Sequence, residues 1–189
     1  MLRYITFANT LKTTAPLITR LITTSAKRRM ATATTISLSP TTTKPEYYRP
    51  GNTPEASRQA SQYLQRNHDD FHIFFHPDGL HNHIAHHLLA LWALNASPLA
   101  LEKAWEKNKD TQRAQPEIDE EVLGKLVKGQ EEGNGEAFLN YVGPRERYHT
   151  WLEFFRKQIE ARGEEEVVRR FLFAGDEVAE TMLVRMFGG

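Results

Sequence analysis

From Glu46 onward, apolar residues recur at intervals of three and four along most of the chain. This is the spacing of helices that bury one face. No stretch alternates apolar and polar residues convincingly, as a half-buried strand would. Thr53, Pro54 and Glu55 together form a helix start, with an N-cap, a first-turn proline and an acid at the positive end of the helix dipole. The pattern therefore predicts a soluble, all-α, mainly helical domain.

Turns and polar loops between the apolar stretches set the expected helix boundaries. A turn at Pro77-Asp78-Gly79 and a polar loop over 109–118 separate the first helices. Phe138 to Val142 fits either a short strand or a helical turn, and the pattern leaves both open. We expect helices over residues 53–71, 80–94, 98–108, 119–128, 148–162, 164–173 and 176–187.

Histidines concentrate in one short part of the chain. Seven of the eight lie between positions 68 and 87: His68, His72, His76, His81, His83, His86 and His87. On a helix, His83 and His87 would stand one above the other, with His86 about 60° to the side of His83. The rest of that expected helix is apolar on every face, as in Ile84, Leu88 and Trp92, so we expect it to be buried.

Burying several imidazoles together would destabilise the fold unless their ring nitrogens were satisfied. Each unsatisfied buried polar group costs about 1–3 kcal/mol, and a divalent metal could coordinate several of these nitrogens at once. The i, i+4 pair His83 and His87 has workable spacing for this, and carboxylates at Asp69, Asp70 and Asp78 are near in sequence. With no cysteine in the chain, nitrogen and oxygen ligands would suit iron, zinc or manganese. The alternative is that these histidines are caps, core or surface residues, which is how we interpret His68 and His149.

Charge is distributed unevenly along the chain. Residues 1–45 carry seven basic residues and no acid, which leaves 17 basic against 24 acidic residues in the remainder, a net charge of −7. An acidic body without a basic stripe argues against a nucleic-acid partner. No apolar run reaches the ~20 residues of a membrane-spanning helix, and no nucleotide-binding or hydrolase motif is present.

Residues 1–45 have the composition of an addressing segment. They are rich in Thr and Ser and carry spaced basic residues among short apolar stretches, as mitochondrial transit peptides do. A disordered tail is the first alternative, and an internal translation start at Met30 is the second. The protein would be mitochondrial if the segment is a transit peptide and cytoplasmic otherwise.

Several segments together resemble the questin oxidase-like family. Phe74-Phe75, the run His81-Asn82-His83-Ile84-Ala85-His86-His87-Leu88-Leu89, Ala93-Leu94 and Ser97-Pro98 carry the likeness most specifically. It continues through Trp105, Asn108 and Gln112-Arg113, and again at Phe138-Leu139 and in the helix from Tyr148. The resemblance covers most of residues 46–189.

The resemblance implies an oxidoreductase of fungal aromatic polyketide metabolism. Members of this family are associated with NADPH-dependent Baeyer–Villiger-type oxidation of anthraquinones, and some look like non-haem iron oxygenases with histidine ligands. Carried over to this chain, the implied metal ligands are His81, His83, His86 and His87, with His72 next. His83 and His87 come first among them. The implied partner is a small aromatic polyketide substrate.

The chain departs from the family in one respect, because family members continue well beyond the position of Gly189. We therefore expect residues 46–189 to be the N-terminal portion of a larger helical fold. Apolar side chains at Leu183, Met186 and Phe187, with Trp151, Phe154 and Phe155, would then form an uncovered face open to self-association. The alternative function is a non-catalytic helical domain that binds a metal or a partner.

Overall fold

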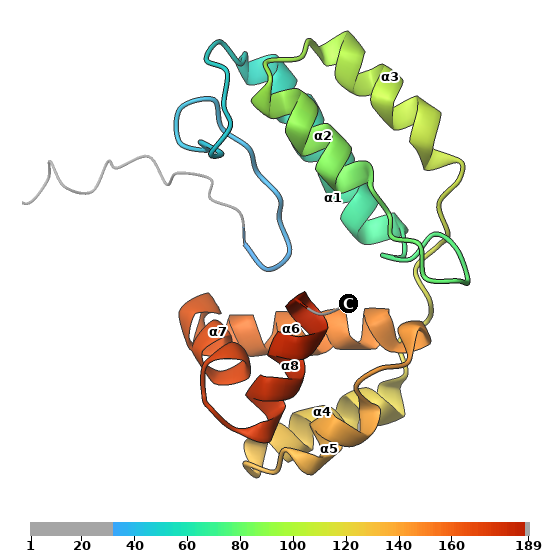
Figure 1. The fold of residues 1–189 in the computed structure, drawn as a ribbon, viewed down its shortest axis with the longest axis vertical. Coiled ribbons are helices and arrows are strands. Elements are labelled where there is room, and N and C mark those ends of the chain that lie inside the picture. The colour runs from blue at the N-terminus through green and yellow to red at the C-terminus, as the bar shows by residue number, and fades with distance from the viewer. Residues whose placement is uncertain (1–31, 188–189) are drawn as a thin grey trace, which may run out of the picture.

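The structure, a computed structural model, describes residues 32–187, with side chains as far as Arg185. These residues form eight α-helices and one 3-10 turn, with isolated bridges but no strand, so the all-α prediction is confirmed. Figure 1 shows their arrangement. The elements are α1 (Pro54–Asp70), α2 (Ile84–Ala93), α3 (Pro98–Lys109), α4 (Glu120–Glu131), α5 (Glu136–Tyr141), η1 (Arg145–Arg147), α6 (Tyr148–Arg162), α7 (Glu164–Leu172) and α8 (Glu177–Phe187).

The helices form two groups, each around its own apolar core (Figure 1). In the first group α1, α2 and α3 pack on one another and bury Trp92 and Trp105 completely. In the second group α4 to α8 surround Phe154 and Phe171. Contacts between helices of the described chain stay within each group, so the groups meet through the loops that connect and flank them.

The helix starts follow the predicted capping chemistry. The hydroxyls of Thr53 and Ser97 accept hydrogen bonds from the third residue beyond them, and Asp119 caps α4 in the same way. The segment that sequence left open between strand and helix is helical, as α5. Helix α4 runs past Gly129 to Glu131, two residues beyond the glycine expected to end it.

The helix expected over 80–94 is shorter and less buried than predicted. Helix α2 begins at Ile84, because residues 80–82 form backbone hydrogen bonds with the 73–75 segment instead. Only the face of α2 that meets α1 and α3 is buried, through Ile84, Leu88 and Trp92. Leu89 is 41% exposed on the opposite face. The expectation of all-round burial was wrong, since an apolar sequence does not by itself supply a covering layer.

The packed part of the chain begins before the predicted boundary at Glu46. Ile36 and Leu38 lie against the first core, and their backbone N–H groups donate to the side chains of Gln65 and Ser61 on α1, at 2.8 Å each. Residues 34–38 therefore form a strap along α1. The predicted transit peptide lies mostly outside the described residues and stays a prediction, as does the alternative start at Met30.

The aromatic residues of α6 are less open than expected. Phe154 is 1% exposed, and the half-buried Trp151 and Phe155 pack edge-on against aromatic neighbours in the second core. The expected exposure of Phe154 was wrong, because α7 packs on α6 there, and self-association stays a prediction. Leu183 is half-buried, while the side chains of Met186 and Phe187 lie outside the described residues.

In residues 32–187, no helix is both long and apolar enough to span a bilayer.

Candidate functional site

Asn82 lies between His81 and His83, and its side-chain hydrogen bonds hold the loop that carries these two histidines. Its side chain is 4% exposed and donates to Oδ1 of Asn67 at 2.8 Å. Its own Oδ1 accepts the N–H of Ile84, the first residue of α2, at 2.9 Å and so fixes the turn that leads into the helix. Because Asn82 points inward, the neighbouring His81 and His83 point outward and are exposed. Asn82 was not singled out from the sequence, although an asparagine two residues before a helix can hydrogen-bond its first backbone N–H.

His72 has a structural role that uses both of its ring nitrogens. It is 3% exposed, and its Nδ1 accepts the N–H of Phe74 at 2.8 Å. Its Nε2 lies 3.1 Å from the carbonyl oxygen of Arg145, which can only accept, so the proton is on Nε2. Burial lowers the pKa of His72, which agrees with a neutral ring. In this arrangement no lone pair remains for a metal.

Arg145 ties the same loop to the second helix group. Its guanidinium donates to the carbonyl oxygen of Pro77 at 2.9 Å and lies 5.2 Å from the ring centre of Phe74. A side chain at Gly79 would meet this guanidinium at 2.5 Å, and the φ of Gly79 is +88°, which favours glycine. The ring of Tyr148, the first residue of α6, stacks on the ring of His72, with 5.5 Å between the two ring centres. The loop is therefore held from both helix groups.

The other predicted ligands lie together on the surface. His83 is the N-cap residue of α2, His86 and His87 occupy its first turn, and all three are exposed. The rings of His83 and His86 are 5.9 Å apart, while His81 packs against Phe74. Within the part of the chain described, no three histidine or carboxylate side chains are grouped to hold a metal ion. These residues alone therefore do not fit an enclosed iron site.

The structure brings together two histidines that sequence reasoning had set aside. His68 near the end of α1 and His149 in the first turn of α6 both line a cavity of about 200 Å³ between these helices and the strap. They are 81 positions apart, and neither belongs to the run that carries the family resemblance. No local pattern could have paired them, because their proximity depends on how the two helix groups meet.

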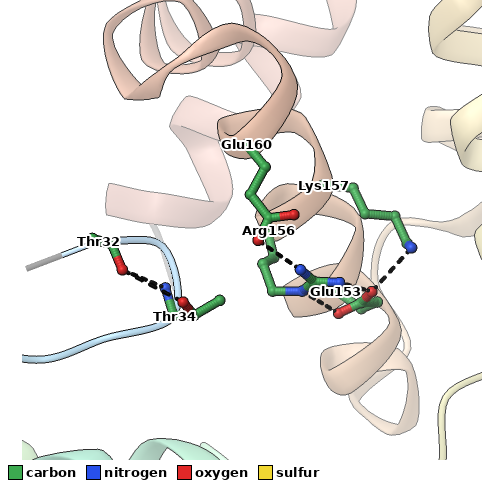
Figure 2. A network of polar contacts seen from close by, with 6 residues as sticks. All are labelled: Thr32, Thr34, Glu153, Arg156, Lys157 and Glu160. Atoms are coloured by element: carbon green, nitrogen blue, oxygen red, sulfur yellow. Dashed lines mark hydrogen bonds and ion pairs between the residues drawn. The ribbon is translucent and has the colours of Figure 1, made fainter.

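A network of charges on α6 borders this cavity (Figure 2). Arg156 donates to both carboxylate oxygens of Glu153 and also to Glu160 at 2.7 Å, and Lys157 lies 3.2 Å from Glu153. Figure 2 shows Thr32 and Thr34 beside this network, hydrogen-bonded to each other, and Thr34 of the strap lines the same cavity. The hydrogen bonds from Arg156 hold the pKa of Glu153 down, from 4.5 to about 2. The network therefore stays ionised over the whole physiological range.

We expect the substitution Glu153→Gln to change how stability depends on pH. A lowered folded-state pKa stabilises the fold above about pH 4.5, and this contribution is lost as the pH falls toward about 2. Screening at this partly exposed site limits the loss at pH 7 to about 1 kcal/mol. Urea unfolding at a series of pH values would measure it, with Glu160→Gln as a control of smaller effect. Parallel pH curves for the wild type and Glu153→Gln would contradict the assignment.

The described chain is thus a helical domain in two groups, which presents imidazoles on a loop and places two more beside an open cavity at the junction of the groups. Residues 80–189 match the model of the family described as questin oxidase-like. The chain belongs to the questin oxidase-like family.

Named relatives agree with this assignment. The chain is 34% identical over 161 residues to a questin oxidase of Aspergillus terreus, which covers 85% of this chain and 34% of that protein. It is 37% identical over 131 residues to a Baeyer–Villiger monooxygenase of Cryptosporiopsis sp., covering 69% of this chain and 28% of the relative. The chain is also 37% identical over 162 residues to an oxidoreductase of Aspergillus parasiticus, AflY, covering 84% of this chain and 31% of that protein. The chain spans about a third of the length of these relatives.

Proposed function

We propose that this chain contributes to an oxidoreductase that carries out Baeyer–Villiger-type oxidation of an aromatic polyketide. The observation that supports the proposal most is the match of residues 80–189 to the family, together with relatives that are named questin oxidase and Baeyer–Villiger monooxygenase. The matched region includes His81, His83, His86 and His87. It also includes His149 and the charge network on α6.

The proposed reaction inserts one oxygen atom of O₂ beside a ring carbonyl of an anthraquinone-like substrate. The second oxygen atom leaves as water, and NADPH with one proton supplies the two electrons and hydrogens that water requires. NADPH rests on the family resemblance, since the sequence holds no nucleotide fingerprint. What the described residues supply is a rigid framework in which Asn82 and His72 fix the loop, while the α6 charges stay paired.

Histidine-bound iron stays a prediction, with His83 and His87 as its first candidate ligands, although the described residues bring no three ligands together. Metal analysis of the purified protein tests it. If these histidines contribute ligands, the double substitution His83→Ala and His87→Ala should remove most of the bound iron, while His76→Ala at another exposed position should retain it. Protein that is free of iron and cannot be reconstituted with Fe²⁺ would contradict the prediction.

The test of the proposed reaction is substrate-dependent oxidation of NADPH. The natural protein that contains this sequence would be incubated with a dihydroxyanthraquinone, NADPH and air. We expect the NADPH absorbance to fall only when the quinone is present, in proportion to product formed. Binding of the quinone without any NADPH oxidation would favour the alternative, a non-catalytic domain.

A further inference from the structure

We propose that the cavity between α1 and α6 binds a single hydroxylated aromatic ring, whose hydroxyl group donates a hydrogen bond to Nε2 of His149. The cavity is bounded by His68 and Asp69 on α1, His149, Leu152 and Glu153 on α6, and Thr34 on the strap. The preference for an aromatic hydroxyl over other hydrogen-bond donors rests on the proposed function. The position of the site and the direction of the hydrogen bond rest on the structure.

The protonation state of His149 follows from its backbone partner. Nδ1 lies 2.7 Å from the carbonyl oxygen of Pro116, which only accepts, so Nδ1 carries the proton when the ring is neutral. The lone pair is then on Nε2, and no hydrogen bond among the described residues reaches that atom. His149 lines the cavity, and its Nε2 keeps a free acceptor lone pair.

The segment that orients His149 is itself anchored from both sides. The side chain of Gln115 donates to the carbonyl oxygen of His68 at 3.1 Å, and the N–H of Asp119 donates to the buried hydroxyl of Thr150 at 2.9 Å. Pro116 lies between these anchors, so its carbonyl is held against α6. An acceptor held in place in this way loses little freedom when a ligand binds.

The charges around the cavity disfavour an anionic ligand. Arg156, the one cation lining it in the described structure, is already paired with Glu153 and Glu160. The carboxylate of Asp69 is left without a cation, although it accepts from the side-chain amide of Gln65 at 3.0 and 3.1 Å. An anion such as a phenolate would therefore be repelled, whereas a neutral hydroxyl meets free acceptors.

The volume limits how much of a ligand can enter. The cavity of about 200 Å³ has room for one substituted ring, since about 150 Å³ holds benzene, and it is open to solvent on one side. Leu152 and Ala33 are the apolar residues of a mostly polar lining, and the imidazole of His68 adds a flat surface. A larger polyketide would insert one terminal ring and leave the rest outside.

The test is an NMR titration of the isotope-labelled full chain with phenol, resolving the imidazole nitrogens. Saturable movement of the His149 Nε2 resonance is expected, and anisole, which cannot donate, should bind about tenfold more weakly, as the loss of one hydrogen bond implies. His149→Asn keeps a donor near the Nδ1 position but lacks the Nε2 acceptor, so it should also bind phenol about tenfold more weakly.

Two further variants separate binding from folding. Leu152→Trp fills the cavity and should abolish saturable phenol binding, while Leu89→Ala, on the outer face of α2, should leave it unchanged. Phenol that moves no His149 resonance, or that binds His149→Asn as tightly as the wild type, would overturn the proposal. Phenol binding without turnover of the anthraquinone would uphold this site and count against the proposed reaction, and turnover without phenol binding would do the reverse.

Discussion

The substitution Trp92→Ala is expected to lower the free energy of unfolding by about 3–5 kcal/mol, the range for removal of a large buried aromatic side chain. Trp92 is 1% exposed and lies at the centre of the first core. Its Nε1–H donates to the hydroxyl of Ser57 at 3.0 Å, and its ring lies 6.2 Å from that of Tyr48. The substitution therefore leaves a cavity where α1 and α2 meet and also removes a buried hydrogen bond.

Leu89 on the same helix provides the matched control. It is 41% exposed and faces away from α1 and α3, so Leu89→Ala should cost no more than about 0.5 kcal/mol. Chemical denaturation of both variants, followed by circular dichroism, measures the difference. Equal losses for the two would mean that the outer face of α2 is covered as well, as the apolar sequence had suggested.

The second large effect is expected at Asn82. Asn82→Ala removes the hydrogen bond to the first N–H of α2 and leaves the part-buried Oδ1 of Asn67 without its donor. The two losses together should lower the free energy of unfolding by about 2–3 kcal/mol. Because Asn82 separates His81 from His83, we also expect the chemical shifts of both imidazoles to change.

Asn82→Asp distinguishes the two contributions of this side chain. Aspartate keeps an acceptor for the N–H of Ile84, and its charge suits the start of a helix, but it loses the donor to Asn67. Its loss of stability should therefore be smaller than that of the alanine variant. Denaturation of both variants measures this, and an alanine variant as stable as the wild type would contradict the role assigned to Asn82.

Much of the fold could be predicted, because helix starts and periods are local signals. Thr53, Ser97 and Asp119 cap the helices that their sequence positions indicate. Their side chains act within three residues, so one sequence is enough to see them.

The failures concern which faces are covered. The apolar residues of α2 and of α6 look alike in sequence, yet Phe154 is buried by α7 while Leu89 faces outward. Covering a face is a tertiary event that periodicity does not encode. His72 was likewise grouped with potential ligands, although Arg145, 73 positions away, occupies its Nε2.

The candidate cavity could not be predicted for the same reason. It needs the end of α1, the start of α6 and the strap at one place, and the residues involved span positions 33 to 156. His149 looked like an isolated histidine in the sequence. Its role emerges from a backbone carbonyl at Pro116, which any residue type would have supplied.

We have proposed that this chain belongs to an enzyme that inserts oxygen into an aromatic polyketide. The most direct measurement is mass spectrometry of the product formed from a dihydroxyanthraquinone and NADPH under isotopically labelled dioxygen. If the proposed reaction occurs, we expect one labelled oxygen atom in a ring-expanded or ring-opened product and the second labelled atom in water. A product that takes its new oxygen from unlabelled water, or a quinone recovered unchanged while the protein is folded, would contradict it.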